Sequence, residues 1–489
     1  MSAWQIVAFV ALAKLVVHVS TSTRYGFHRD ELYYITGGLN LSLGYVDHPP
    51  LVPLLAALAH ALFGLSLPGL RLFSTLAGVT LVALAGLIAR ELGGGRFAIG
   101  LASFAALACP IYLLTNSLFQ TVTFDQLIWV TGGWLVLRLL NTGDARYWPL
   151  LGLVFGIGLL TKYTIVIFVA GLALGFLLTC HRAWLRTRWP WLAVGIALLV
   201  ASPNLWWQIS NGWPSLEFIH NSSAREREER SFVTFPAVQL MMIGPLALPL
   251  VIAGVRGWFC QSLARYRPLA VAIAFAFILL MTLEAKPYYF APAYVLILAA
   301  GAVMAEGAFA VASRAWMRSA TVAMLTVNVL LLLPILIPIL PAGTAARYNI
   351  FEMNDAFAES LGWNELAQTT AAAWHTLTPE QQERATIVAG SYGSAAAVDL
   401  YGARYGLPGA VSGHNSYYVW GPGTLRPEYL ILVGFLPGQL ELIDGTCTPA
   451  GTVTNRLNVE NDEFNRPVYV CRDLHRALQD FWPELRDFQ

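Results

Sequence analysis

Apolar segments long enough to cross a lipid bilayer recur along the first 341 residues of this chain. A spanning helix needs about 20 apolar residues, and fewer when it is short or surrounded by other helices. We predict spans at 2–21, 68–90, 97–114, 124–140, 148–160, 163–180, 191–209, 236–256, 268–283, 290–310 and 319–341. Only 12% of all residues are charged, against roughly 25% in soluble globular proteins. The sequence therefore predicts a polytopic α-helical membrane protein with about eleven spans.

Two apolar segments need a separate interpretation. Segment 2–21 has neither a basic start nor a small-residue cleavage site, so we expect a retained helix rather than a signal peptide. Segment 51–64 is apolar but short, which favours an interfacial or re-entrant helix. The net charge of +1 gives no sign of nucleic-acid binding.

The distribution of arginine predicts the orientation in the membrane, because short cytoplasmic loops collect Lys and Arg. In an eleven-span chain the arginine-rich loops share one side, and they contain Arg90, Arg96, Arg138, Arg146, Arg182, Arg186, Arg188, Arg256, Arg265, Arg267, Arg314 and Arg318. The opposite side holds 22–67, 115–123, 161–162, 211–235, 284–289 and everything after 342. We therefore expect a cytoplasmic N-terminus in the cell (inner) membrane and a periplasmic or extracellular C-terminal region.

Residues 342–489 have the composition of a soluble domain. Segment 354–377 looks helical, ATIVAGSYG predicts a strand and turn, and SAAAVDLYGARYG the helix that follows. YLILVGF and PVYVCRDL predict further strands, and HRALQDFWPELRDF a closing helix. This alternation predicts a small α/β domain. Outside the cytoplasm Cys447 and Cys471 can form a disulfide or remain two free thiols, and the sequence leaves both open.

The first outer loop, HRDELYYITGGLNLSLGYVDHPP at 28–50, is unusually rich in ionisable groups. Asp30 and Glu31 are adjacent and would point about 100° apart on a helix, so one would react while the other binds or orients. A carboxylate that enters a membrane span, as Asp125 does, is costly unless it faces a cavity or a partner. The alternatives are a solvated loop pair for Asp30 and Glu31 and a helix N-cap for Asp125.

Cationic residues gather on the same predicted outer side. They are Arg71, Lys162, Lys286 and His48. Such groups suit a phosphate at the membrane surface, which Lys and Arg bind by charge and donated hydrogen bonds. Single lysines there also reach lipid headgroups, and it is the number of cations that favours a phosphate. A zinc site is not favoured, because His28 and His48 lie twenty residues apart without an HExxH motif.

Two further polar segments stand out. SGHNSYYVWGPG places His414, Asn415, Tyr417 and Trp420 together. Aromatic faces beside amide and imidazole groups suit the binding of an acceptor or a sugar, although the same residues can form a plain turn. The charged run at 222–231 predicts a solvated helix or loop, or a gate over the site.

The chain resembles bacterial glycosyltransferase family 39, a family of C-type membrane glycosyltransferases similar to protein O-mannosyltransferases and the lipid A aminoarabinose transferase. The resemblance is carried by the first loop, by GLRLFSTLAGV, by the TFDQ entry, by LLTKYT and by KPYYFAPAY. It covers roughly 1–340 as a glycosyltransferase domain whose catalytic loop is 22–67. The chain departs from the family where His48 replaces the lysine that precedes the Pro-Pro pair, and a histidine is only partly charged near neutral pH.

The resemblance implies transfer of a sugar from a polyprenyl-phosphate donor to a lipid, glycan or protein acceptor at the outer membrane face. Asp30 would be the base, with Glu31 beside it and Asp125 as a second carboxylate. Phosphate binding would rest on Arg71, Lys162 and Lys286 more than on His48. Asp30, Glu31 and Asp125 could hold a divalent metal or work without one, and the sequence leaves both open. The rival interpretations are a lipid or sugar transporter, which should carry mid-span charge pairs, and a non-catalytic sugar-binding subunit.

Overall fold

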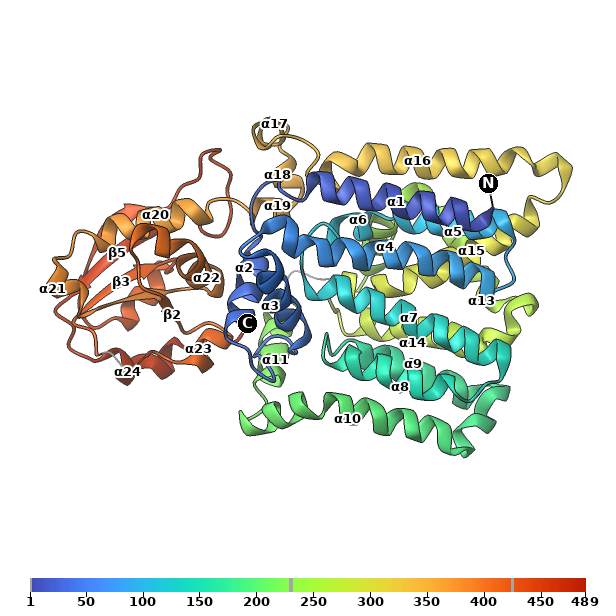
Figure 1. The fold of residues 1–489 in the computed structure, drawn as a ribbon, viewed down its shortest axis with the longest axis horizontal. Helices are drawn as coiled ribbons and strands as arrows, with labels where there is room; N and C mark the ends of the chain where they lie inside the picture. The colour runs from blue at the N-terminus through green and yellow to red at the C-terminus, as the bar shows by residue number, and fades with distance from the viewer. Residues whose placement is uncertain (1, 228–231, 424–425) are drawn as a thin grey trace.

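The computed structural model describes residues 2–227, 232–423 and 426–489. A bundle of long helices runs in one direction, and a mixed α/β domain covers one end of it (Figure 1). The helices of the bundle are α1 (Ala3–Thr21), α4 (Leu67–Glu91), α5 (Arg96–Ala108), α6 (Pro110–Thr115), α7 (Thr121–Thr142), α8 (Tyr147–Leu159), α9 (Ile165–Leu178), α10 (Arg188–Ser210), α12 (Phe235–Ile243), α13 (Leu248–Phe259), α14 (Arg267–Thr282), α15 (Tyr294–Ala308) and α16 (Trp316–Leu336).

Each of the eleven predicted spans overlaps at least one of these helices. Within the described ranges, six helical stretches are long and apolar enough to cross a membrane, and eight if each of two bent pairs counts as one span. The helices α12 and α13 form one such pair, bent by 89°. Because α5 and α8 have only 13 residues each, the predicted number of eleven is not confirmed, whereas a membrane protein with several apolar helices is.

Small residues let the helices of the bundle approach closely, as is common in membrane proteins. A Cβ atom on Gly254 of α13 would lie 2.1 Å from the carbonyl oxygen of Ile297 in α15. The same atom on Gly301 of α15 would lie 2.2 Å from the carbonyl oxygen of Leu250. Larger side chains at either glycine would therefore force these two helices apart.

The arginine-rich loops meet at the end of the bundle away from the α/β domain, where α1 also begins (Figure 1). The hydroxyl of Tyr266 donates to the carbonyl oxygen of Glu91 over 2.9 Å. Arg138 Nη1 lies 3.1 Å from Glu91 Oε1, and Arg265 Nη2 lies 3.1 Å from the carbonyl oxygen of Asn141. Loops that are distant in sequence thus form one basic end, as the orientation argument expects.

The first loop, residues 22–67, contains two helices, α2 (Arg29–Leu39) and α3 (Leu51–Phe63), which pack on each other between the bundle and the α/β domain (Figure 1). After α16, three short helices complete the junction: α17 (Ala342–Arg347), α18 (Ile350–Met353) and α19 (Asp355–Ala358). The ring centroid of Tyr25 lies 5.1 Å from that of Phe351 and 5.2 Å from that of Phe357. The start of the C-terminal region therefore packs directly on the first loop, and the predicted boundary at 341 stays a prediction.

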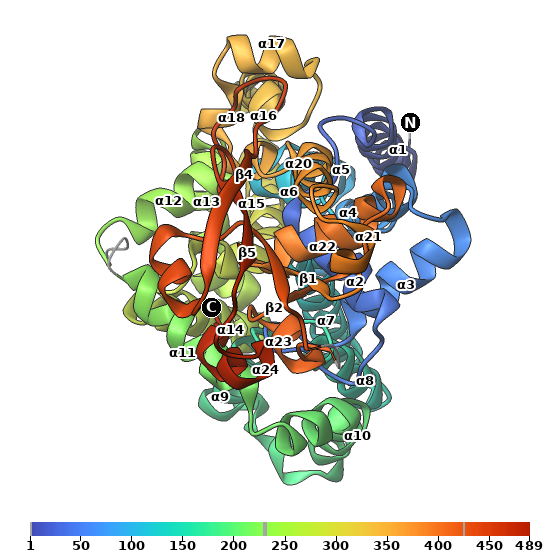
Figure 2. The same ribbon diagram turned by 90° about the vertical axis from the view of Figure 1, so that its left-hand side faces the viewer.

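The C-terminal domain is built on a five-stranded sheet in the order β2-β1-β3-β5-β4 (Figure 2). Its strands are β1 (Ala385–Ala389), β2 (Ala410–Ser412), β3 (Tyr429–Val433), β4 (Thr446–Thr452) and β5 (Pro467–Arg472). Strand β1 runs parallel to β2 and β3, and β5 runs antiparallel to β3 and β4. Two helices accompany it, α20 (Trp363–Trp374) and α22 (Tyr392–Tyr401). The strands predicted at β1, β3 and β5 are present, and β2 and β4 were not predicted.

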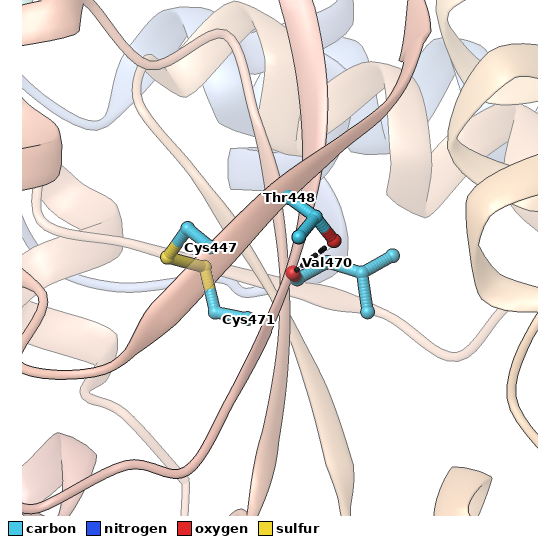
Figure 3. Close-up of a disulfide and its surroundings, with 4 residues drawn as sticks. All are labelled: Cys447, Thr448, Val470 and Cys471. Atoms are coloured by element: carbon cyan, nitrogen blue, oxygen red, sulfur yellow. Dashed lines mark hydrogen bonds between the residues drawn. A yellow bond between two sulfur atoms is a disulfide. The ribbon is translucent and has the colours of Figure 1, made fainter.

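The predicted closing helix is much shorter in the structure, where a four-residue helix, α24 (Leu478–Phe481), is followed by a 3-10 turn, η8 (Trp482–Leu485). Pro483 has no backbone N–H and interrupts an α-helix at this point. The pairing of Cys447 with Cys471, left open by the sequence, is present as a disulfide between β4 and β5 (Figure 3). These two cysteines are direct cross-strand partners in the sheet, so the bond fastens the edge strand β4.

Candidate active site

The helix α2 begins with a capping box formed by His28. His28 Nδ1 accepts a hydrogen bond from the amide of Asp30 over 3.1 Å, and Glu31 Oε2 accepts one from the amide of His28 over 2.8 Å. Because Nδ1 uses its lone pair in this way, it cannot donate to Asp30 Oδ2, although the two atoms lie 4.0 Å apart. Burial also lowers the pKa of His28. His28 is therefore a cap that fixes where α2 starts.

Glu31 and Arg71 form a buried ion pair in which every donor of the guanidinium is used. Arg71 Nε and Nη2 each lie 2.8 Å from a different oxygen of Glu31. The remaining guanidinium hydrogens reach the backbone carbonyl oxygens of Ser22, Arg24 and Gly26. Neither side chain is more than 2% exposed. In this arrangement Arg71 holds the first loop on α4, and no guanidinium donor is left for a phosphate.

Asp30 is more open than the adjacent Glu31, with 31% of its side chain exposed against 0% for Glu31. Its Oδ1 accepts a hydrogen bond from the hydroxyl of Tyr392 over 2.8 Å. Across the described residues, Oδ2 accepts none. Burial opposes the charge, but His28, Arg29, the hydrogen bond from Tyr392 and Lys286 together outweigh it and lower the pKa of Asp30. Asp30 is thus an ionised carboxylate with one oxygen held and one available.

Asp125 lies five residues after Gln120, the residue that precedes α7, so it does not cap this helix. It is 2% exposed, and its Oδ2 accepts a hydrogen bond from Thr164 Oγ1 over 2.9 Å. Oδ1 is buried and has no hydrogen-bond partner among the residues the structure describes. Such a carboxylate is costly unless an opposite charge lies nearby.

That charge comes from Lys162, in the turn between α8 and α9. Its ammonium group interacts electrostatically with Asp125, Lys286 and Asp30. Lys162 Nζ also lies 5.1 Å and 4.7 Å from the ring centroids of Tyr288 and Tyr289, which follow Lys286 in sequence. We call Asp30, Asp125, Lys162 and Lys286 the outer polar cluster. Four residues from separate parts of the sequence are thus gathered at the covered end of the bundle.

His48 lies inside the first loop and is 4% exposed. Its Nδ1 donates to the carbonyl oxygen of Pro49 over 3.1 Å. Its ring packs among tyrosines, with centroids 4.8 Å from Tyr45 and 5.1 Å from Tyr34. Since His48 is buried among these tyrosines, its phosphate-binding role stays a prediction without a supporting contact.

The predicted acceptor-binding segment divides into three residues that are bonded within their own domain and one that lines a cavity. His414 Nε2 and Asn415 Nδ2 both contact the backbone oxygen of Gln489, and Tyr417 donates to Asp399 over 2.6 Å. These three side chains hold the C-terminal domain together. Trp420 instead lines a cavity of about 400 Å³ between the first loop, α10 and the C-terminal domain. The cavity is also lined by Leu39, Asn40, Leu41, Ser42, Gly44, Trp207, Ser416 and Val419.

An apolar groove of about 490 Å³ lies between α12, α13, α14 and α15. Phe290, four residues after Lys286, lines it together with Tyr294 and Gln239. Trp258 and Phe259 line it near the end of α13, beside the basic loops. The groove therefore runs through the bundle from the neighbourhood of Lys286 towards the end that carries the basic loops.

Sequence reasoning missed Tyr392, which joins the C-terminal domain to Asp30. The residue was placed only in the turn that follows a predicted strand. Ligands of α/β domains bind beyond the carboxyl ends of parallel strands. The position of Tyr392 in the turn after β1 was therefore the signal that could have indicated a functional residue. The predicted metal site is not supported by the arrangement: no group of three or more His, Cys, Asp or Glu side chains able to hold a metal occurs in the described parts of the chain. Glu31 is moreover fully engaged by Arg71.

Comparisons with known proteins agree with this architecture. Residues 47–207 match the family model described as dolichyl-phosphate-mannose-protein mannosyltransferase. The crystal structure of ArnT from Cupriavidus metallidurans bound to undecaprenyl phosphate is similar, with a TM-score of 0.63 at 15% identity over 95% of this chain and 97% of that one. The apo state of ArnT gives a TM-score of 0.62 at 16% identity over the same shares.

The oligosaccharyltransferase AglB from Archaeoglobus fulgidus, in complex with an inhibitory peptide and a dolichol-phosphate, has a TM-score of 0.50 at 12% identity, over 93% of this chain and 74% of that one. A comparison with curated protein sequences found no match. The resemblance indicated by the first loop is confirmed by the family match and by the fold, which extends over nearly the whole chain. This protein has the fold of the C-type membrane glycosyltransferases.

Proposed function

We propose that this protein transfers a sugar from a polyprenyl-phosphate donor to an acceptor hydroxyl at the outer face of the membrane. The observation that carries the proposal is the outer polar cluster, in which an ionised Asp30 with a free oxygen lies in the field of two lysines. The likeness to ArnT, solved with undecaprenyl phosphate, supports the same class of donor.

The donor lipid would lie in the groove between α12 and α15. A polyprenyl chain cannot leave the bilayer, and an apolar groove inside the bundle suits its isoprene units. Because Phe290 lines the groove and Lys286 precedes it by four residues, the phosphate of a lipid in this groove would lie near Lys286. Lys162 is close enough to Lys286 to interact with it. The two ammonium groups would then neutralise the phosphate as it leaves.

The reaction would be a single displacement. An oxygen of Asp30 accepts the proton of the acceptor hydroxyl. The acceptor oxygen forms a bond to the anomeric carbon while the bond from that carbon to the phosphate oxygen breaks, and the electron pair stays with the polyprenyl phosphate. Attack opposite the leaving group inverts the anomeric configuration. Asp125 would keep Lys162 charged and in place.

We further propose that the covered end of the bundle faces the periplasm or the cell exterior. The meeting of the arginine-rich loops at the other end supports this, as does the disulfide, which oxidising compartments permit. Cys180 is an exposed free thiol at the basic end. A maleimide that cannot cross membranes should label Cys180 only after cells are permeabilised. Labelling in intact cells would show the opposite orientation.

The test of function uses membranes that contain wild-type protein or Asp30→Asn, supplied with radiolabelled polyprenyl-phosphate sugars that differ in the sugar. We expect wild type to release labelled sugar from one donor. Asp30→Asn keeps the size of the side chain, and the loss of a general base should lower the rate by about 10²- to 10⁴-fold.

Asp144→Asn is the matched control, because Asp144 lies at the basic end, where it pairs with Arg146. This variant should retain wild-type transfer. A folded Asp30→Asn protein with full activity would remove Asp30 from the mechanism. Movement of intact donor across the membrane without release of sugar would instead identify a transporter.

A further inference from the structure

We infer that Tyr392, supplied by the C-terminal domain, is a positioning residue that holds Asp30 for proton transfer. The inference rests on the proposed function, because it assigns a task within the same site. It makes the α/β domain a part of the active site rather than an appendage.

The contact itself is short and directional. The hydroxyl of Tyr392 donates to Asp30 Oδ1 over 2.8 Å. A carboxylate can rotate about its Cβ–Cγ bond. A hydrogen bond to one oxygen fixes the plane of the group and therefore the position of the other oxygen. Since Oδ2 accepts no hydrogen bond from the described residues, Oδ2 is the oxygen that would meet an acceptor hydroxyl. Tyr392 thus acts through Asp30 and need not touch the substrate.

Tyr392 is itself held on several sides. Its ring centroid lies 4.6 Å from that of Tyr33 in the first loop and 4.9 Å from that of His414 in its own domain. The guanidinium carbon of Arg29 lies 5.6 Å from the ring centroid. Tyr392 also begins α22, where Ser391 caps the helix by accepting from the amide of Ser394 over 3.1 Å. A side chain fixed at this helix start can therefore impose its geometry on Asp30.

The two domains are joined around this contact by further bonds. Val46 donates from its amide to Ser416 Oγ over 3.0 Å, and Ser416 donates from its amide to the hydroxyl of Tyr33 over 3.1 Å. Tyr33 in turn donates to Asp47 over 2.8 Å. The placement of Tyr392 over Asp30 is therefore set by a continuous polar and aromatic interface.

The charged and titratable groups around Asp30 come from four parts of the chain. They are His28, Arg29 and Tyr34 of the first loop, Lys162 between α8 and α9, Lys286 before α15, and Tyr392 of α22. The hydrogen bond from Tyr392 favours the charged form of Asp30 and is one of the causes that lower its pKa. Removing the hydroxyl should therefore raise the pKa of Asp30.

The experiment compares wild type with Tyr392→Phe, which keeps the ring packing and removes only the hydroxyl. We expect kcat to fall about 10- to 100-fold, the range for a hydrogen bond to a charged group, with KM changed less than about twofold. Transfer requires ionised Asp30 and is lost as the pH falls through its pKa. The acid limb should accordingly move to higher pH in the variant.

Tyr405→Phe is the control, because it removes a hydroxyl of the same domain that bonds Asn364 instead of Asp30. It should leave kcat and the acid limb unchanged. Adding Tyr392→Phe to Asp30→Asn should lower the residual rate no further if Tyr392 acts through Asp30. A monodisperse Tyr392→Phe protein with wild-type kcat and an unmoved acid limb would overturn the inference while leaving the proposed function intact.

If wild type transfers sugar from no donor, the proposed function fails, and a second readout still decides the contact. The infrared carboxylate band that is lost in Asp30→Asn reports the titration of Asp30. Its midpoint should lie at higher pH in Tyr392→Phe than in wild type. Equal midpoints would show that Tyr392 does not hold Asp30.

Discussion

Asp30 and Glu31 are neighbours in sequence, yet the fold gives them opposite surroundings. Glu31 accepts hydrogen bonds from the amides of His28 and Phe119 and two from Arg71. Asp30 accepts one side-chain bond, from Tyr392. The two carboxylates leave α2 in different directions. Glu31 points towards Arg71 in the bundle, and Asp30 points towards the lysines of the outer polar cluster.

The contrast separates a structural charge pair from a reactive one. A carboxylate whose lone pairs are all occupied can neither take up a proton nor meet a substrate. A carboxylate with one oxygen free can do both, provided that neighbouring cations keep it ionised. Asp125 resembles Asp30 more than Glu31 in this respect, because its Oδ1 is buried without a described partner. Substitutions in the Glu31–Arg71 pair should therefore affect stability, and substitutions in the outer polar cluster should affect activity.

The largest effect is expected from Arg71→Ala, which leaves Glu31 buried and charged without its partner. Breaking a buried ion pair in this way costs about 3–5 kcal/mol. The thermal unfolding midpoint in detergent should fall sharply, and much of the protein should aggregate. The double variant Glu31→Gln/Arg71→Met should lose less, because no lone charge remains.

Arg146→Ala is the matched control for this pair. Arg146 also bonds a carboxylate, Asp144 at 2.8 Å, but its side chain is 88% exposed. Exposed ion pairs contribute little to stability, so its unfolding midpoint should equal that of wild type. If Arg71→Ala were as stable as this control and lost only donor binding, Arg71 would belong to the phosphate site after all.

A smaller effect, and one on activity alone, is expected from Asp125→Asn. Removal of a buried charge with an unsatisfied oxygen should leave stability unchanged or slightly raised. Lys162 loses the carboxylate that attracts it most strongly and can shift, and a misplacement of about 1 Å can cost about 10² in rate. Transfer measured beside the unfolding midpoint checks both expectations. A destabilised Asp125→Asn protein would place Asp125 with Glu31 as a structural residue.

The membrane class and most of the C-terminal strands could be predicted because apolar runs and alternation are local properties of the sequence. The strand β2 has only three residues, and β4 contains Pro449 and Gly451, so both carry weak local signals. The closing helix was overestimated because a helical pattern was read through Pro483. The number of spans depends on how bent pairs such as α12 and α13 cross the bilayer, which composition does not determine.

The candidate site was predicted in part for the same reason. Asp30, Asp125, Lys162 and Lys286 could be selected one by one as charges at helix ends, and the fold brings them together. The pairing of Glu31 with Arg71 spans 40 residues and depends on the direction in which each side chain leaves its helix. Nothing local distinguishes Asp30 from Glu31, and nothing local links Tyr392 to a residue 362 positions earlier.

The smallest effect is expected from Trp420→Ala, which tests whether the open side of the site extends to the cavity between the first loop and α10. An aromatic face contributes about 0.5–1.5 kcal/mol to a packed contact, so KM for the acceptor should rise about 2- to 10-fold while kcat stays constant. Trp206→Ala is the control, because Trp206 is 68% exposed and is not among the residues that line the cavity. Equal kinetics in both variants would confine the substrate to the outer polar cluster. A fall in kcat with Trp420→Ala would instead mean that the cavity helps to place the reacting hydroxyl beside Asp30. The active site would then include α23 (Ser416–Trp420) of the C-terminal domain.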